Sequence, residues 1–257
     1  MFYYNHGIDF KDKQVANKIF DIYANKDDTL GSRVLSVMLK CSRDRIKRIM
    51  AKYDITARTK RRSYKYAGKA DNIFNNLLRT DINLEDYEIV FSDIFEFRLS
   101  DSSKVYCCFA LRKVTRQIVS FVYSYHRPAE LVTETLNHIN LLDLSNTKAI
   151  WHSDQGSQYG AIITVKRLLE LGFTISMSRA GTPTDNGYAE RFVGMFKLAV
   201  VEKKRYKTLG EFVKQADQWL NFYNNERPHS SLNYLSPNQF AIKNNLENIS
   251  YLSINSV

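Results

Sequence analysis

The sequence predicts an α/β fold, in which a mixed sheet of three antiparallel and two parallel strands is flanked by helices and follows a small helical domain. Two observations support this prediction. Three segments rich in β-branched and aromatic residues follow one another closely between residues 87 and 125, as in an antiparallel meander. After them, helical and strand-like segments alternate as far as residue 204, which is typical of parallel strands joined by helices.

The expected strands and helices can be placed along the second part of the chain. Antiparallel strands are expected at residues 87–99, 104–114 and 116–125, and parallel strands at residues 147–154 and 173–178. Apolar residues at helical spacing predict helices at residues 128–142, 159–171 and 182–204. Pro128 suits the first turn of the first helix, and Gly172 suits the end of the second.

The N-terminal part also carries apolar residues at helical spacing. A first helix is expected around residues 15–23 and a second over residues 32–40. Ser42 is a favoured N-cap residue, so a third helix is expected to follow it, with Ile46 and Ile49 in its buried stripe. Two short helices with a tight connection and a basic second helix are typical of a helix-turn-helix domain. An ordinary small helical bundle is the alternative.

Positive charge is concentrated in one segment. The chain has 37 Lys and Arg against 27 Asp and Glu, a formal net charge of +10. Residues 43–69 contain eleven basic and two acidic residues, as expected of an element that contacts DNA phosphates. A solvated helix face followed by a linker is the alternative. The residues of this segment that are predicted to bind DNA are Arg43, Lys47, Arg48, Arg58, Lys60, Arg61 and Arg62.

These patterns divide the chain into four parts. We expect a helical DNA-binding domain over residues 1–55, a basic linker over 56–71, a larger α/β domain over 72–207 and a C-terminal helical and loop segment over 208–257. The first residues lack the pattern of a signal peptide, and no apolar run is long enough to cross a membrane. The three cysteines lack the spacing of a disulfide framework or a zinc site. A cytoplasmic location is therefore expected.

Three acidic residues stand out because of the elements that carry them. Asp93 lies inside the first expected strand, where a carboxylate is costly to bury unless it is paired or binds a metal ion. Asp154 ends the fourth strand, and ligands of α/β proteins gather at the carboxyl ends of strands. Glu190 lies in the first turns of the last long helix, beside its apolar stripe. Each residue alone is more often structural or solvated, but the three together form a more specific pattern.

Convergent carboxylates on rigid elements are what metal-assisted phosphodiester chemistry requires. Two Mg²⁺ ions about 3.5–4 Å apart stabilise the attacking and the leaving oxygen, and Mg²⁺ takes oxygen ligands in octahedral geometry. Asp93, Asp154 and Glu190 are therefore candidates for catalytic residues and for the ligands of two Mg²⁺ or Mn²⁺ ions.

The segments around these residues resemble those of a known family. HSDQGSQYGA, which contains Asp154, and MSRAGTPTDNGYAERFVGMFK, which contains Glu190, are similar to the catalytic core of two-reading-frame insertion-sequence transposases, relatives of retroviral integrases. Thirty-five residues separate Asp154 from Glu190, which is the spacing of the family's Asp-Asp-Glu triad. FSDIF around Asp93, the helical region before the core and FYNNERPHSSLNYLSPNQF also resemble the family, so the likeness covers nearly the whole chain.

The resemblance implies an RNase H-like integrase catalytic core over residues 72–207. The family exposes a 3′-hydroxyl at each element end by hydrolysis, and that hydroxyl then attacks a second phosphodiester. The implied partner is double-stranded DNA, both element ends and target, with the chain acting as a homo-oligomer on the bacterial nucleoid. No membrane or small-molecule cofactor is implied. Lys197, seven residues after Glu190, matches a basic residue of the family that is thought to meet DNA near the reactive end.

The chain departs from the family pattern beside Asp93. Val90 stands in place of a Trp, and Ser92 in place of a Thr. A decayed copy that binds DNA without cutting it is therefore one alternative, and an RNase H-like nuclease that needs no specific DNA ends is another. Asp185, which follows Pro183 closely, is expected to cap the last helix rather than to bind metal.

Overall fold

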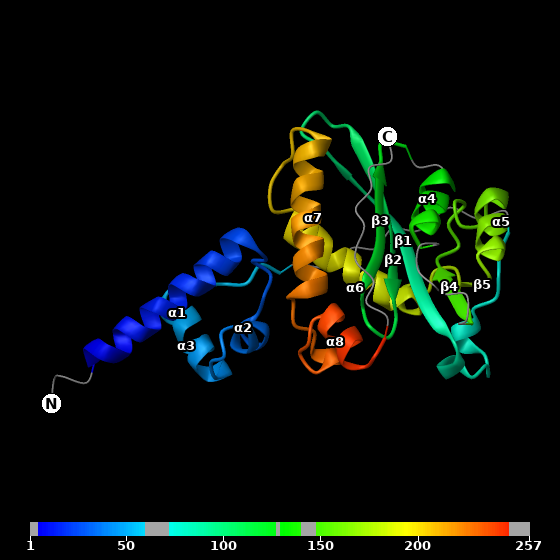
Figure 1. The fold of residues 1–257 in the computed structure, drawn as a ribbon. Helices are drawn as coiled ribbons and strands as arrows, with labels where there is room; N and C mark the ends of the chain where they lie inside the picture. The colour runs from blue at the N-terminus through cyan, green and yellow to red at the C-terminus, as the bar shows by residue number, and fades with distance from the viewer. Residues whose placement is uncertain (1–4, 60–71, 127–128, 140–147, 247–257) are drawn as a thin grey trace.

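The computed structural model describes residues 5–59, 72–126, 129–139 and 148–246 (Figure 1). Three helices come first, and a sheet with helices on both faces follows them. None of the described helices is both long and apolar enough to cross a membrane. The first three helices are α1 (Asn5–Asn25), α2 (Ser32–Met38) and α3 (Arg43–Lys52).

Five strands form one mixed sheet in the order β3-β2-β1-β4-β5. The strands β1, β2 and β3 are antiparallel neighbours, whereas β4 and β5 run parallel to β1. The predicted combination of three antiparallel and two parallel strands is confirmed. Because β1 is the central strand, a residue in its middle is held by strands on both sides. The strands are β1 (Glu88–Arg98), β2 (Lys104–Arg112), β3 (Ile118–Ser124), β4 (Ala149–Ser153) and β5 (Phe173–Met177).

Alternate residues of β1 face two different helix layers (Figure 1). Phe91 and Phe95 lie in the apolar cluster that includes α6 and α7, whereas Val90 lies in the cluster that includes α4 and α5. This is the two-residue period of a strand that is buried on both faces. Asp93 is two residues away from both Phe91 and Phe95 along the strand, so it lies on the same face, which α6 covers. The helices are α4 (Ala129–Ile139), α5 (Ile162–Glu170), α6 (Gly187–Phe196) and α7 (Leu209–Asn225).

The expectation of one continuous helix over residues 182–204 is wrong at both ends. A 3₁₀ turn, Pro183–Asn186, precedes α6, and a π-helical turn, Lys197–Val201, follows it. The Glu202 N–H donates to the carbonyl of Lys197 at 2.8 Å, which closes the wider turn. Such π turns are rare and often occur at functional sites. The helix predicted from residue 128 is found as α4, although Pro128 lies outside the described residues. After α7 come a 3₁₀ turn, Ser230–Leu232, and α8 (Pro237–Lys243).

The N-terminal helices have the predicted arrangement. Ser42 caps α3, since its hydroxyl accepts a hydrogen bond from the backbone N–H of Arg45 at 3.3 Å. Ile46 and Ile49 are fully buried beneath α3, as the apolar stripe predicts. A short turn joins α2 to α3, so the pair has the connectivity of a helix-turn-helix.

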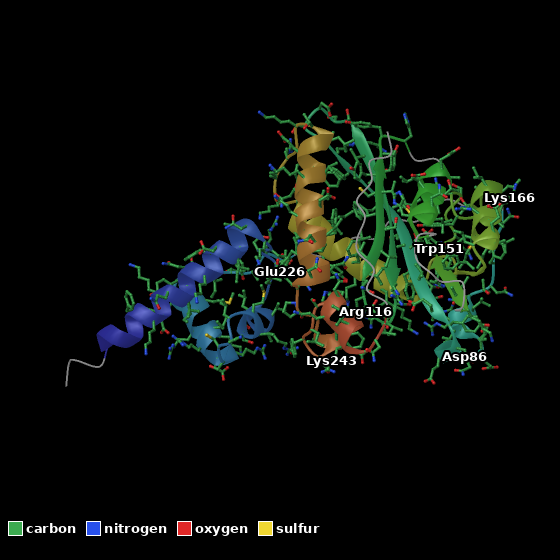
Figure 2. The ribbon with its side chains drawn as sticks, in the orientation of Figure 1. Asp86, Arg116, Trp151, Lys166, Glu226 and Lys243 are labelled. Carbon is green, nitrogen blue, oxygen red and sulfur yellow. The ribbon has the colours of Figure 1, made fainter. Side chains whose placement is uncertain are left out.

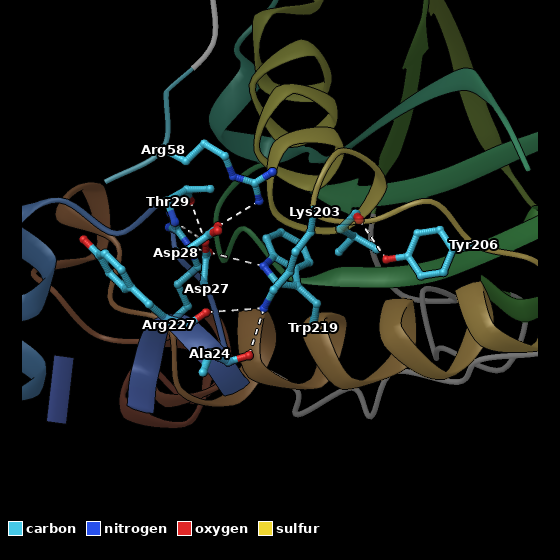
Figure 3. Close-up of polar contacts among 11 residues, drawn as sticks. Ala24, Asp27, Asp28, Thr29, Arg58, Lys203, Tyr206, Trp219 and Arg227 are labelled. Carbon is cyan, nitrogen blue, oxygen red and sulfur yellow. Dashed lines mark hydrogen bonds and ion pairs between the residues drawn. The ribbon is translucent and has the colours of Figure 1, made fainter. Parts of the chain in front are cut away.

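A polar network joins the N-terminal helices to α7 (Figure 3). Asp27 has a side chain with no exposed surface, and it accepts hydrogen bonds from Trp219 Nε1 at 3.2 Å and from the Thr29 hydroxyl at 2.6 Å. The guanidinium of Arg227 completes an ion pair with Asp27 at 3.5 Å. Glu226, which Figure 2 shows at the same junction, pairs with Lys26. The N-terminal helices therefore pack directly against the core.

Candidate active site

Asp93 lies in the middle of the sheet and faces α6. Its partner in the register is Phe109 on β2, and the ring of Phe109 lies 4.5 Å from the ring of Phe192 on α6. The register between β1 and β4 pairs Phe91 with His152. Since Asp154 follows His152 by two residues, as Asp93 follows Phe91, the two aspartates stand at the same height on neighbouring strands.

Asp154 is held by the turn that leaves β4. Its Oδ1 accepts a hydrogen bond from the backbone N–H of Gly156 at 2.9 Å. A Cβ added to Gly156 would lie 2.9 Å from the same oxygen, which is closer than real Cβ contacts come. The glycine is therefore required for a close approach between the backbone and the carboxylate, and it fixes where the Asp154 side chain points.

Glu190 reaches the same region from α6. The side-chain amide of Asn186, at the start of α6, donates to the carbonyl of Ser92 at 3.1 Å. This bond ties the N-terminus of α6 to the residue before Asp93. Ala189 and Phe192 anchor the apolar side of the helix in the core, and Glu190 is partly exposed beside them.

Both other predicted carboxylates influence the pKa of Asp93. Burial is the largest cause that raises the pKa of Asp93 to about 8, and the negative charge of Asp154 is the next. A hydrogen bond from the Ile94 N–H at 2.8 Å and the positive charge of Lys197 lower this pKa, while the charge of Glu190 raises it by the smallest amount. Asp154 and Glu190 therefore both lie within electrostatic range of Asp93, and Glu190 is the more weakly coupled of the two.

Lys197 lies beside the strand that carries Asp93. Its Nζ lies 5.3 Å from the ring centroid of Phe95, two residues beyond Asp93 on the same face of β1. The positive charge of Lys197 also lowers the pKa of Asp93. The sequence places Lys197 two helical turns beyond Glu190, and the structure adds that it begins the π-helical turn.

The donor set suits a hard divalent cation, because carboxylate oxygens are the ligands that Mg²⁺ and Mn²⁺ prefer. When Asp93 is ionised it is repelled by Asp154, and a bound cation would offset that repulsion. Within the described residues, however, no group of three Asp, Glu, His or Cys side chains already stands close enough to hold a metal ion. Among the three predicted carboxylates, the coupling of Asp93 to Asp154 is the stronger and its coupling to Glu190 the weaker.

The departures from the family pattern lie on the other face of β1. The hydroxyl of Ser92 is 2.8 Å from the hydroxyl of Tyr159, and both residues are fully buried. Val90 packs in the cluster that includes α4 and α5. Neither substituted side chain therefore shares the face that carries Asp93, and the interior accommodates both.

The residues predicted to bind DNA fall into three groups. Arg43 and Lys47 are exposed on α3, and Arg48 is also exposed but pairs with the buried Asp12 at 2.9 Å. Arg58 is less accessible, because it pairs with Asp28 at 2.8 Å beside the junction (Figure 3). The remaining predicted residues, Lys60, Arg61 and Arg62, lie outside the described residues.

Asp185 does not cap α6, so that prediction is wrong. Neither the 3₁₀ turn nor α6 has a side-chain cap, and the carboxylate of Asp185 turns instead to Arg179, Arg79 and Asn76. The hydrogen bond from the Arg179 side chain is the main reason why the pKa of Asp185 lies well below its usual range. The sequence gives no signal for the partnership with Arg79, because 106 residues separate it from Asp185.

Comparisons with known proteins concern the family of the chain. The integrase core domain family matches residues 84–183 and residues 171–237, which together are more than half of the chain. An uncharacterized transposase-like protein of Haemophilus influenzae is 29% identical over 201 residues, which are 77% of this chain and 92% of that protein. The transposase for insertion sequence element IS904 of Lactococcus lactis is 31% identical over 127 residues, which are 49% of this chain and only 50% of that protein.

A solved structure shows the shared fold. A chain of the simian T-cell lymphotropic virus intasome, in complex with PP2A regulatory subunit B56 gamma, is 12% identical, with a TM-score of 0.52. The match covers 93% of this chain and 78% of that chain. At this level of identity the likeness speaks for the fold alone, and it confirms the predicted RNase H-like core.

Proposed function

We propose that this chain, which belongs to the integrase-core transposases of bacterial insertion sequences, cleaves DNA at the ends of a mobile element and joins those ends to a target. Asp93, Asp154 and Glu190 are its catalytic residues in this proposal. The observation that supports it best is the electrostatic coupling of Asp93 to both other carboxylates and to Lys197.

Each residue has a role that follows from its position. Asp93, held on a strand between β2 and β4, would be a rigid ligand for the metal. Asp154 is oriented by the Gly156 N–H and faces the same space. Glu190 closes the site from α6. Bound Mg²⁺ or Mn²⁺ supplies charge stabilisation on the attacking and leaving oxygens.

The reaction has two displacements at phosphorus. In the first, water attacks a phosphodiester at the element end and releases a 3′-hydroxyl and a 5′-phosphate. In the second, that 3′-hydroxyl attacks a target phosphodiester in line, so that one P–O bond forms as another breaks and a new 3′-hydroxyl leaves. Lys197 neutralises a DNA phosphate near the reacting strand, and the basic face of α3 holds the duplex. Holding the 3′-hydroxyl against the target phosphate supplies much of the rate enhancement.

The test compares purified wild-type protein with Asp154→Asn in nicking of supercoiled plasmid and in joining of labelled element ends. Wild type should act only with Mg²⁺ or Mn²⁺, and Asp154→Asn should lose at least two orders of magnitude in rate. Asp81→Asn is the matched control, since Asp81 is exposed. Unchanged activity of Asp154→Asn would refute the proposal. Binding without any cutting by wild type would favour a decayed copy, and cutting of RNA–DNA hybrids alone would favour a nuclease.

A further inference from the structure

Two arginines share one buried carboxylate at the edge of the active site. We name Arg79, Arg179 and Asp185 the arginine clamp. The Asp185 side chain has no exposed surface, whereas the Arg79 and Arg179 side chains are 57% and 59% exposed. Arg79 lies in the 3₁₀ turn Leu77–Arg79, and Arg179 follows β5, so the clamp joins two segments that are far apart in the chain.

The bonds within the clamp hold both guanidinium groups in fixed positions. Arg179 donates from Nε to Asp185 Oδ2 at 2.9 Å and from a terminal nitrogen to Oδ1 at 3.3 Å. Arg79 donates to the same Oδ1 at 3.0 Å. Since terminal nitrogens of both arginines meet one oxygen, they lie close enough together for a single phosphate group to contact both. Asn76 and the backbone N–H of Arg179 also donate to Asp185, at 2.8 and 3.3 Å.

The clamp is tied to the backbone beside each catalytic aspartate. Asn186, next to Asp185, donates to the carbonyl of Ser92, which precedes Asp93. On the other side, the N–H of Ser178, next to Arg179, donates to the carbonyl of Ser153 at 2.9 Å. Ser153 precedes Asp154. The clamp therefore stands one residue away from two hydrogen bonds to backbone carbonyls, and each carbonyl belongs to the residue before an active-site aspartate.

A purely structural role does not explain the composition of the clamp. One arginine would neutralise Asp185, and a buried ion pair adds little stability over an apolar contact of the same size. The second arginine leaves a local charge of +1 on an exposed surface. An arginine fork fits phosphate oxygens in a bidentate manner, and a guanidinium aligned beforehand loses less entropy on binding.

We propose that the arginine clamp binds one backbone phosphate of the DNA strand next to the scissile phosphodiester. Arg79 and Arg179 contact the phosphate, and Asp185 is a positioning residue that aligns the two guanidinium groups. This inference rests on the proposed function, because it assumes that a DNA strand crosses the edge of the sheet at Asp93 and Asp154. It adds a DNA-binding site within the core that is separate from the basic segment of the N-terminal domain.

The test measures two properties of the full chain in parallel. The first is the salt dependence of binding to a short fluorescent DNA duplex in EDTA, which needs no catalysis. The second is Mg²⁺-dependent plasmid nicking. The variants are Arg79→Gln and Arg179→Gln. The matched control is Arg167→Gln, because Arg167 lies on α5 and pairs there with Glu170 at 3.4 Å. Figure 2 shows the neighbouring Lys166 on the outer side of this helix.

Each clamp variant should reduce the slope of log affinity against log salt by about 0.9, as expected for one lost phosphate contact. Nicking should fall roughly tenfold or more at limiting DNA, while the Mg²⁺ concentration for half-maximal rate stays the same. Arg167→Gln should change neither property. Wild-type slope and rate in both clamp variants would overturn the proposal.

Failure of the proposed function and loss of stability in the variants can each be distinguished from failure of the clamp proposal. If wild type nicks no DNA, the proposed function fails, and the salt slopes still decide whether the clamp meets a phosphate. If the Gln variants melt at a lower temperature than wild type, the same measurements are made with Arg79→Lys and Arg179→Lys instead. They keep the charge but lose the fork, so nicking should fall at an unchanged salt slope. Unchanged nicking in both Lys variants would then reject the clamp as a phosphate site.

Discussion

Replacing Asp93 by Asn should make the metal-free protein more stable at alkaline pH. The pKa of Asp93 is raised from 3.8 to about 8, chiefly by burial and then by the charge of Asp154. A carboxyl whose folded pKa is raised contributes stability that is fully present below the unfolded pKa and is lost as pH rises through the folded pKa. Between about pH 4 and pH 8 the unfolded wild type ionises Asp93 freely, while the folded protein does not. Asn has no ionisable proton, so Asp93→Asn does not lose this stability as the pH rises.

The size of the effect follows from the pKa shift. One pKa unit corresponds to about 1.36 kcal/mol, so the shift sets an upper limit of about 5–6 kcal/mol. Asp93 is partly exposed, and solvent screening reduces the effect to on the order of 2 kcal/mol. For a chain of this size, about 2 kcal/mol corresponds to a difference in Tm of roughly 4–8 °C.

The assay is thermal unfolding in EDTA between pH 5.5 and pH 9 for wild type, Asp93→Asn and the exposed control Asp81→Asn. The advantage of Asp93→Asn over wild type should grow with pH and level off above about pH 8. Mg²⁺ should raise the Tm of wild type at pH 8 and leave that of Asp93→Asn nearly unchanged. A Tm difference that is the same at every pH would refute the reasoning, because it would mean that Asp93 is not forced to keep its proton.

Three further predictions concern the neighbours of this site and the junction. Gly156→Ala should lower the rate of nicking at least tenfold with little loss of Tm, because the added Cβ would lie 2.9 Å from Asp154 Oδ1. A wild-type rate of nicking in this variant would contradict the argument. Lys197→Gln removes a charge that lowers the pKa of Asp93, so the acid limb of the pH–rate profile should move to higher pH, and an unmoved limb would count against it. Trp219→Phe should lose about 1–3 kcal/mol of unfolding free energy more than Trp151→Phe. The reason is that Trp219 Nε1 donates to the buried Asp27, whereas Trp151 Nε1 has no hydrogen-bond partner. If urea unfolding shows equal losses of unfolding free energy for the two variants, the bond to Asp27 does not stabilise the fold.

The sheet could be predicted because the residue pattern that specifies each strand lies within the strand itself. The apolar and β-branched residues of β1, β2 and β3 alternate with a two-residue period, and the segments that follow change to helical spacing. The positions of Asp93 and Asp154 could be anticipated for a related reason. One lies in the central strand and the other at the end of its parallel neighbour, so sheet topology alone brings them together.

The remaining details depend on contacts between distant residues. Asp185 has the sequence of a helix cap, yet two arginines and Asn76 outcompete the helix N–H groups for its oxygens. The π-helical turn after α6 could not be foreseen either, because its residues have an ordinary helical pattern. Likewise, Arg58 belongs to a strongly basic run but pairs with Asp28, thirty residues earlier in the chain.

The unequal coupling of the three carboxylates suggests how metal binding and DNA binding are linked. Asp93 cannot move away from Asp154, since β2 and β4 hold β1 on both sides. The charge of Asp154 therefore disfavours ionisation of Asp93 in the folded protein, and Lys197 offsets only part of this effect. Glu190 is attached to a helix whose start is bonded to Ser92 and whose preceding residue, Asp185, organises the arginine clamp. A DNA phosphate bound at the clamp would thus fix the start of the helix that carries Glu190. If Glu190 is a metal ligand, as proposed, DNA and metal should bind more tightly together than either does alone.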